Sequence, residues 1–247
     1  MRGLRKLMLV ELKLFLREPE TFFFTLIFPM VMLFVFGSIY GNKPVEIFGG
    51  RGTVDISVPA YMGLIIAVTG LMSIPISTAT DREKGVLRRL RATPVRLQTI
   101  LIARIMMYFV MTLVGALLLV AAGKIVYGLR FDGNALYVFL AFIISALSFF
   151  ALGFVIASLA PTGRTANIVG MALFFPMIFF SGATIPWNVL PDGVQMVGRA
   201  LPLTYVVKLL QGLWFAEPWN EHLLKVAVLA GMLIVGVVVS AKIFRWE

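Results

Sequence analysis

Residues 80–94 read TDREKGVLRRLRATP, a charged stretch that lies between two long apolar runs. Thr80 can act as an N-cap, and Glu83 follows three residues later, which is the spacing of a capping box. Acidic residues precede the arginines, an order that matches the dipole of a helix. Pro94 cannot continue a helix and ends the pattern. The sequence therefore predicts a short, capped, amphipathic helix over residues 80–94 between two apolar segments.

The composition indicates an integral membrane protein. Of the 247 residues, 60% are hydrophobic and 14% are charged, whereas about a quarter of the residues in a soluble domain are charged. A helix needs about 20 apolar residues to cross a bilayer, so the chain has room for about six spans and no soluble catalytic domain. Because the chain has no cysteine and a single histidine, His222, it has no disulfide, cysteine-type zinc site or histidine metal cluster.

The apolar runs predict an all-α integral membrane protein with one transmembrane domain over residues 1–247. Residues 1–20 are basic with apolar residues at helical spacing, which is typical of an interfacial helix and not of a signal peptide. Residues 183–221 are rich in proline and contain no run long enough to cross. We expect a re-entrant pair of short helices there, at 189–200 and 203–215, dipping into the outer leaflet; the alternative is a plain surface loop. The six expected spans are residues 22–40, 57–79, 98–122, 135–159, 165–182 and 222–243.

The charge distribution predicts which side of the membrane each loop occupies. The formal net charge is +10, which in a soluble protein would suggest nucleic acid but in a membrane protein reflects the positive-inside rule. An even number of spans puts both termini on one side, and most of the lysines and arginines fall on that side. We therefore expect both termini and residues 80–94 in the cytoplasm, a multi-pass protein of the cell membrane, and no nucleic-acid partner.

The chain has no energy source of its own. Apart from boundary residues such as Arg104 and Lys225, the expected spans hold no Asp, Glu, Lys, Arg or His, which argues against an ion-coupled carrier. The glycine-containing stretch 128–133 lacks the Lys-Ser/Thr of a P-loop. If the protein moves a molecule uphill, the energy must come from another chain that contacts the cytoplasmic face.

Three stretches resemble type-2 ABC exporter permeases, and together they cover nearly the whole chain in order. The pattern Glu83-x-Gly85-Val86-Leu87-x-x-Leu90-x-x-Thr93-Pro94 resembles the cytoplasmic coupling helix of that family. Arg17-Glu18-Pro19 is similar to the end of its N-terminal interfacial helix. The remaining match is to the fifth span and the outer re-entrant hairpin, on Phe175-Pro176, residues 181–186, Leu190-Pro191 and residues 201–205.

The resemblance implies a permease subunit that pairs with a second copy or a homologue and sits on two ATP-binding-cassette ATPases. ATP and Mg would be bound by those ATPases, so this chain would hold no cofactor and catalyse no reaction. The family exports drugs, antibiotics, lipid-linked and other amphipathic molecules, and the short loops of this chain are more similar to the drug and antibiotic exporters. Membrane lipid and an amphipathic small molecule are therefore expected partners.

The same resemblance assigns two groups of residues. For Glu83, capping its own helix and meeting a basic residue of the ATPase are both open. The arginines of residues 80–94 have two readings as well, pairing with partner carboxylates or facing solvent and phospholipid. The ATPase-coupling group is Arg17, Glu18, Glu83, Gly85, Leu87, Arg88, Leu90, Thr93 and Pro94. The outer gate or path group is Phe175, Pro176, Ser181, Gly182, Pro186 and Tyr205.

Two other function classes stay open at this point. A membrane-embedded enzyme or assembly factor would have no transport activity, and a channel would conduct without nucleotide. Co-purification of an ATP-binding-cassette subunit separates a permease from both.

Overall fold

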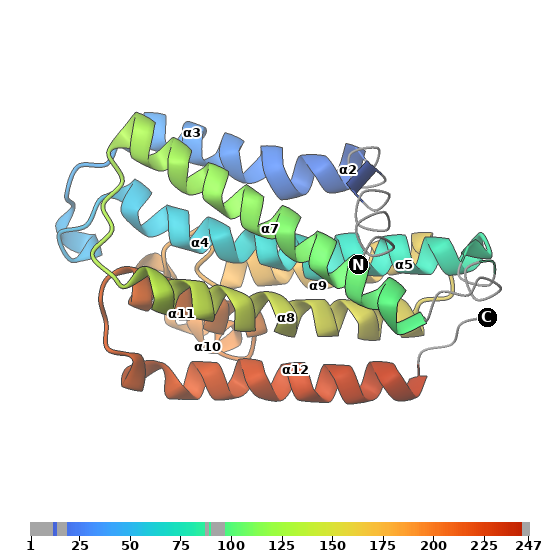
Figure 1. The fold of residues 1–247 in the computed structure, drawn as a ribbon. Coiled ribbons are helices and arrows are strands. Elements are labelled where there is room, and N and C mark those ends of the chain that lie inside the picture. Colours follow the sequence, from blue (N-terminus) through green and yellow to red (C-terminus); the bar gives the residue numbers. More distant parts are fainter. Residues whose placement is uncertain (1–11, 14–18, 87–88, 90–96, 244–247) are drawn as a thin grey trace.

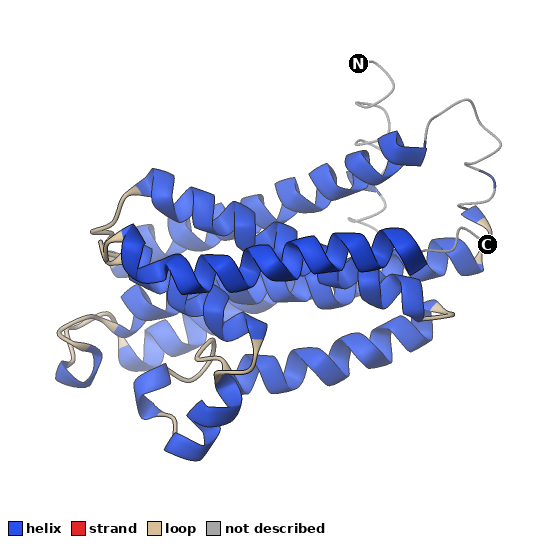
Figure 2. Cartoon of the chain, turned by 90° about the horizontal axis from the view of Figure 1, so that it is seen from below, coloured by secondary structure: helices blue, strands red, loops and turns tan. Residues whose placement is uncertain are grey.

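The computed structural model describes residues 12–13, 19–86, 89 and 97–243. In these ranges the regular secondary structure is helical and no strand is present (Figure 2). Within these ranges six helices are long and apolar enough to cross a membrane, which agrees with the expected all-helical fold. These helices are Phe23–Tyr40, Thr53–Glu83, Thr99–Tyr127, Ala135–Leu159, Gly163–Phe180 and Trp219–Ile243.

The second span is the central element of the bundle. It consists of α4 (Thr53–Val68), the π-helical turn η3 (Thr69–Ser73) and α5 (Ile74–Glu83), which follow one another without a break. In its apolar window 89% of the residues are buried, against 11% to 61% in the other five spans. It extends beyond the expected residues 57–79 at both ends, and the other elements pack around it.

Prolines account for the wide turns in the first two spans. Pro75 follows η3 and has no N–H to donate to the carbonyl of Leu71, four residues earlier. A π turn adds one residue to the ladder at that point, as often occurs where a regular helix is interrupted. The first span shows the same order, with α2 (Pro19–Phe22), the π turn η1 (Phe23–Ile27) and then α3 (Phe28–Tyr40), which carries Pro29 in its first turn.

The other spans surround this central helix (Figure 1). α3 and α7 (Leu97–Tyr127) pack against α4, while α8 (Ala135–Leu159) and α9 (Gly163–Phe180) pack against η3 and α5. α12 (Leu223–Ile243) follows the short helix η5 (Trp219–His222) and packs along α8. The bounds of α8 are those expected, whereas α7 continues to Tyr127 instead of ending at 122.

The segment between the fifth and sixth spans contains the two expected short helices. After η4 (Trp187–Val189) come α10 (Asp192–Gly198) and α11 (Pro202–Trp214). α11 is deeply buried and packs against α4, α8 and α12, so a plain surface loop is wrong for this part of the chain. The depth of this segment in a membrane stays a prediction.

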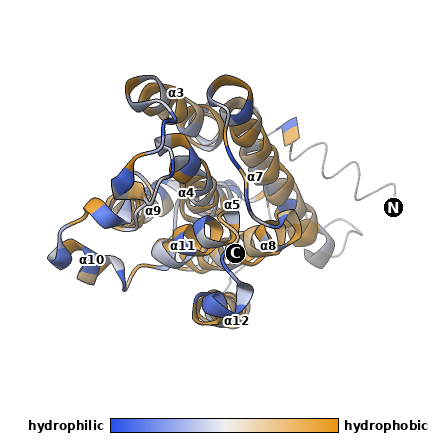
Figure 3. Cartoon of the chain, turned by 90° about the vertical axis from the view of Figure 1, so that its left-hand side faces the viewer, coloured by the Kyte–Doolittle hydropathy of each residue, from blue (hydrophilic) through white to orange (hydrophobic). Residues whose placement is uncertain are grey.

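The two ends of the bundle carry the polar residues. α2, the end of α5 and the end of α12 lie together at one end, which we call the Glu83 end (Figure 1). At the other end, which we call the Asp55 end, lie the start of α4 and the 3-10 turn η2 (Glu46–Phe48). Hydrophilic residues gather in the loops of the Asp55 end, and the sides of the helices are hydrophobic (Figure 3). This distribution suits a body whose flanks face lipid.

Candidate functional site

The last turn of α5 carries three charged residues, Asp81, Arg82 and Glu83, each bonded to a different neighbouring helix. We call these three residues the α5 clasp. They lie in the charged stretch singled out in the sequence. However, α5 runs without interruption to Glu83, so Thr80 is inside this helix and the predicted N-cap at Thr80 is wrong.

The first contact of the clasp joins α5 to α7. Asp81 forms an ion pair with Arg104, whose guanidinium also lies 3.4 Å from the Thr78 hydroxyl. Arg104 is only 4% exposed, so its charge depends on protein partners and not on water. Because a buried charge is costly unless it is paired and hydrogen-bonded, this pair fixes the end of α5 to α7.

The other two contacts join α5 to the ends of α8 and α9. The Arg82 guanidinium donates to the carbonyl of Ala160, the C-cap of α8. The Glu83 carboxylate accepts a hydrogen bond of 3.0 Å from the backbone N–H of Gly163, the first residue of α9. A cation at a helix C-terminus and an anion at an N-terminus both match the helix dipole. Glu83 therefore caps α9, and the alternative that it caps its own helix is wrong.

The chain turns sharply directly after the clasp. Lys84 is the C-cap of α5, and Gly85 has a φ of +66°, a left-handed conformation that suits glycine. The Arg89 N–H then bonds to the Gly85 carbonyl at 3.2 Å. The structure thus places Glu83 and Gly85 in one turn at the end of α5. The other predicted coupling residues lie outside the described residues: Arg17, Glu18, Leu87, Arg88, Leu90, Thr93 and Pro94.

The predicted outer gate residues lie on α9, on the segment that follows it and on α11. Phe175 and Pro176 are exposed on the side of α9, with 49% of Phe175 accessible. Ser181 and Gly182, at the end of α9, are buried. Pro186 is the N-cap of η4. Tyr205 lies on α11, and its hydroxyl donates to the Arg199 carbonyl at 2.9 Å.

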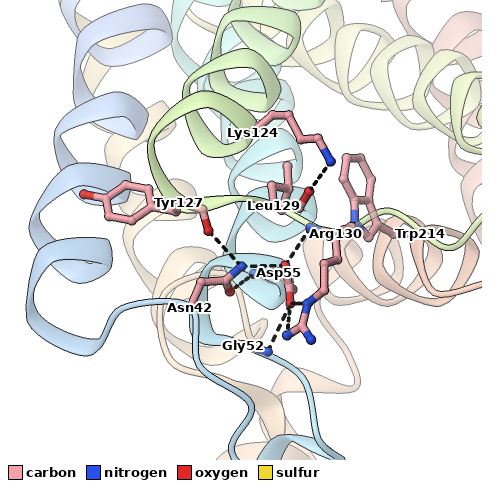
Figure 4. A network of polar contacts seen from close by, with 8 residues as sticks. All are labelled: Asn42, Gly52, Asp55, Lys124, Tyr127, Leu129, Arg130 and Trp214. Carbon is pink, nitrogen blue, oxygen red and sulfur yellow. Dashed lines mark hydrogen bonds and ion pairs between the residues drawn. The ribbon is translucent and has the colours of Figure 1, made fainter.

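A buried carboxylate at the Asp55 end was not singled out from the sequence. The Asp55 side chain is 2% exposed and accepts four hydrogen bonds (Figure 4). Two come from Arg130, through its backbone N–H at 2.9 Å and its Nε at 2.8 Å. The others come from the Asn42 amide at 2.9 Å and the Gly52 N–H at 3.1 Å. Asp55 thereby joins the start of α4 to the loops on either side of it in space.

The same network reaches α7 and α11. The Asn42 amide also lies 3.4 Å from the Tyr127 carbonyl at the end of α7, and the Trp214 indole N–H donates to the Arg130 carbonyl at 2.9 Å. We call Asn42, Gly52, Asp55, Tyr127, Arg130 and Trp214 the Asp55 network. The signal in the sequence that could have indicated this network was a lone aspartate, Asp55, at the start of an apolar run. No group of three or more His, Asp or Glu side chains in the described ranges could hold a metal ion.

Replacing Asp55 with alanine is expected to lower the free energy of unfolding by about 3 kcal/mol, because several buried donors lose their acceptor at once. Thermal unfolding of the purified protein in detergent measures this loss. The matched control is Asp132→Ala, which removes an exposed carboxylate from the neighbouring loop. Equal unfolding temperatures for the two variants would contradict a structural role for the network.

Comparison with known proteins gives the family. Residues 3–215 match the family described as ABC-2 type transporter. The chain is 23% identical to the "Putative transport permease ycf38" of Porphyra purpurea, over 92% of this chain and 79% of that protein. It is 24% identical to the "Probable multidrug ABC transporter permease YbhS" of Escherichia coli K12, over 64% of this chain and 42% of that protein. It is 30% identical to "Nodulation protein J" of Rhizobium leguminosarum bv. viciae, over 44% of this chain and 42% of that protein. The chain therefore belongs to the ABC-2 type transporter family and is the membrane subunit of an ABC transporter.

Proposed function

We propose that this chain is the permease of an ATP-binding-cassette exporter that moves an amphipathic or hydrophobic molecule out of the cell. ATP is hydrolysed by a separate subunit, which docks at the Glu83 end on the cytoplasmic side. The observation that carries the proposal is the α5 clasp. The segment that resembles a coupling helix follows α5 directly, and the clasp ties the end of α5 to three other spans.

The clasp can transmit a movement of the docked ATPase to the spans. A force applied to the chain after Gly85 reaches α5 first and then α7, α8 and α9 through charged contacts. Ion pairs and hydrogen bonds of this kind hold helix ends in discrete arrangements, so a push at one point shifts several spans together. The excess of basic residues on the side of the chain that holds the Glu83 end supports the cytoplasmic orientation.

A second permease copy or homologue completes the proposed assembly. Several large apolar side chains on α9 are exposed, including Ile168 at 61%, Phe175 at 49% and Phe179 at 49%. Such a face suits either lipid or another permease. Drugs, antibiotics and lipid-linked molecules are the proposed substrate classes, supported by the resemblance to drug exporters and by the relative named a multidrug permease.

Purification tests the partnership. The full chain, tagged and expressed with its candidate ATP-binding-cassette subunit, should copurify with that subunit and stimulate its ATPase activity when substrate is added. A membrane enzyme or assembly factor would not show substrate-stimulated ATPase activity. Conductance in planar bilayers without nucleotide would instead identify a channel.

Replacing Glu83 with alanine should uncouple the complex. The variant leaves the Gly163 N–H at the start of α9 without its acceptor and removes the charged contact between α5 and α9. We expect a complex that still assembles but whose transport falls at least about tenfold, a fall that corresponds to ~1.4 kcal/mol. The control is Glu46→Ala, which removes an exposed carboxylate at the opposite end. Unchanged transport by the Glu83 variant would show that the clasp does not couple ATP to the spans.

A further inference from the structure

A polar cavity of about 290 Å³ lies at the Asp55 end, between α11, the start of α12 and two loops. Its wall contains three basic side chains, Arg51, Lys208 and Lys225, and one carboxylate, Glu217. Two further large pockets, between α7, α8 and neighbouring helices, have almost entirely apolar walls. We call this third cavity the basic pocket.

Aromatic rings hold two of the cations in place. The Lys208 ammonium lies 3.4 Å from the centre of the Trp187 ring, and the Arg51 guanidinium carbon lies 3.6 Å from the centre of the Phe215 ring. Cation–π contacts orient a cation but leave its charge uncompensated. In the part of the chain that the structure describes, no carboxylate lies within ion-pair distance of Arg51, Lys208 or Lys225.

The single carboxylate of the pocket is directed towards a buried histidine. The Lys225 ammonium lies 2.7 Å from His222 Nδ1, and an ammonium can only donate, so Nδ1 accepts and the ring proton is on Nε2. Nε2 lies 3.4 Å from the Glu217 carboxylate and has no hydrogen-bond partner in the described structure. The Glu217 carboxylate thus lies beside the His222 ring, which is 0% exposed, and with three cations and one carboxylate the pocket has an excess of positive charge.

The lowered pKa of Lys208 agrees with an excess of positive charge in the pocket. Burial, together with the positive charges of Arg199 and Lys225, lowers the pKa of the Lys208 ammonium to about 8. A negative group entering the pocket would favour the charged form and raise that pKa again. Lys208 is thus a cation that has no ion-pair partner among the described residues.

We propose that the basic pocket binds an anionic group of the phosphate or carboxylate type, with Arg51 and Lys208 as its ligands. Arginine can bind such a group through two parallel N–H donors, and lysine adds a point charge. The group could belong to a lipid headgroup or to a soluble anion, because both present the same oxygens. This site does not depend on the ATPase partnership, and its test can be made on the permease alone.

The first experiment separates the two sources. The purified full chain is placed in nanodiscs of phosphatidylcholine with or without phosphatidylglycerol, and native mass spectrometry counts the retained anionic lipid. Inorganic phosphate is titrated separately into phosphatidylcholine nanodiscs, with tryptophan fluorescence as the readout because Trp187 contacts Lys208. Retention of phosphatidylglycerol alone identifies a lipid site, and saturable binding of phosphate identifies a soluble-anion site. Binding of neither anion would overturn the proposal.

Charge-removing variants identify the ligands. Lys208→Gln and Arg51→Gln should each weaken anion binding about tenfold, as the loss of one charge-assisted hydrogen bond implies. The matched control is Lys242→Gln, which removes the same charge from the exposed far end of α12. An equal loss in all three variants would mean that net charge, and not the pocket, attracts the anion, and this would overturn the proposal.

The pH dependence of anion affinity tests the role of Lys208 even if the Lys208→Gln variant is poorly folded. Binding needs the protonated ammonium, so affinity should be full below pH 8 and should fall as the pH rises through about 8. The other charged or titratable groups around Lys208 are Arg51, Arg199, Glu217, His222 and Lys225. Lys208→Arg keeps the charge at high pH, so it should bind the anion and lose the fall near pH 8. A Lys208→Arg variant with the wild-type pH profile would contradict the assignment.

Discussion

Replacing Arg104 with methionine should lower the free energy of unfolding by about 3–5 kcal/mol, because removing one partner of a buried ion pair leaves the other charge uncompensated. The Asp81 carboxylate is 22% exposed and loses the cation that balances it. The variant also separates the end of α5 from α7, so transport should be lost along with stability. Thermal unfolding in detergent and transport in proteoliposomes measure the two effects.

Two further variants show whether the pair itself is responsible. Lys84→Met removes an exposed cation two residues beyond Arg82, with no ion pair in the described structure, and should leave the unfolding temperature near wild type. Asp81→Asn combined with Arg104→Met removes both charges and should recover part of the stability lost in the single variant. A single Arg104 variant as stable as the Lys84 control would contradict the buried pair.

Replacing Gly170 with valine should prevent the normal packing of α9 on the second span. A β-carbon at Gly170 would lie 2.3 Å from the carbonyl oxygen of Leu71, in the π turn that precedes Pro75. A backbone oxygen cannot rotate away as a flexible side chain can, so the two helices must separate. Close contacts of this kind through small residues are how membrane helices pack. We expect a loss of about 3 kcal/mol, at the upper end for overpacking.

Gly231 provides the matched control for this variant. It lies in α12, and a β-carbon added there would meet no atom within 4 Å. Gly231→Val should therefore give a monodisperse protein that unfolds at the wild-type temperature, whereas Gly170→Val should aggregate or unfold at a lower one. Size-exclusion chromatography and thermal unfolding distinguish them. Similar behaviour of the two variants would mean that α9 is not held closely against η3.

Elements with local boundary signals could be predicted from the sequence. α8 was expected at 135–159 and is found there, because Asn134 caps its start by accepting from the Leu136 N–H and Pro161 prevents its continuation. The six spans were predicted for a similar reason, since each is a long apolar run between polar residues. α7 continues past Gly123 and Lys124 and ends at Tyr127, directly before Gly128 with its left-handed φ of +64°, so the end expected at 122 was too early.

The misplaced helix start at Thr80 has a tertiary cause. Thr80 and Glu83 have the spacing of a capping box, but the helix of the second span does not stop before them. Glu83 finds its N–H donor at Gly163, eighty residues later in the chain. A local pattern cannot show which of two helix ends an acidic side chain will cap, so the predicted start at Thr80 was wrong.

The Asp55 network and the basic pocket could not be predicted from the sequence for the same reason. Asp55 and Arg130 are 75 residues apart and meet only because α4 and α7 run side by side. In Lys208 and Arg51, the sequence shows two ordinary basic residues near aromatic ones. Only the fold brings Lys208 and Arg51 into one cavity, where neither forms an ion pair with a carboxylate among the described residues.

The unbroken second span also sets the bilayer thickness that this protein prefers. Residues 56–80 contain no Asp, Glu, Lys, Arg or His, and at 1.5 Å per residue they extend about 37 Å. The hydrocarbon core of a typical bilayer is about 30 Å thick. With charged contacts at both ends, this helix cannot shorten by sliding, so a thin bilayer must be met by tilt or by local thickening of the lipid. The spacing between Asp55 and Asp81 therefore fixes the length of the central helix, and a mismatch with the lipid must be taken up by the spans that surround it.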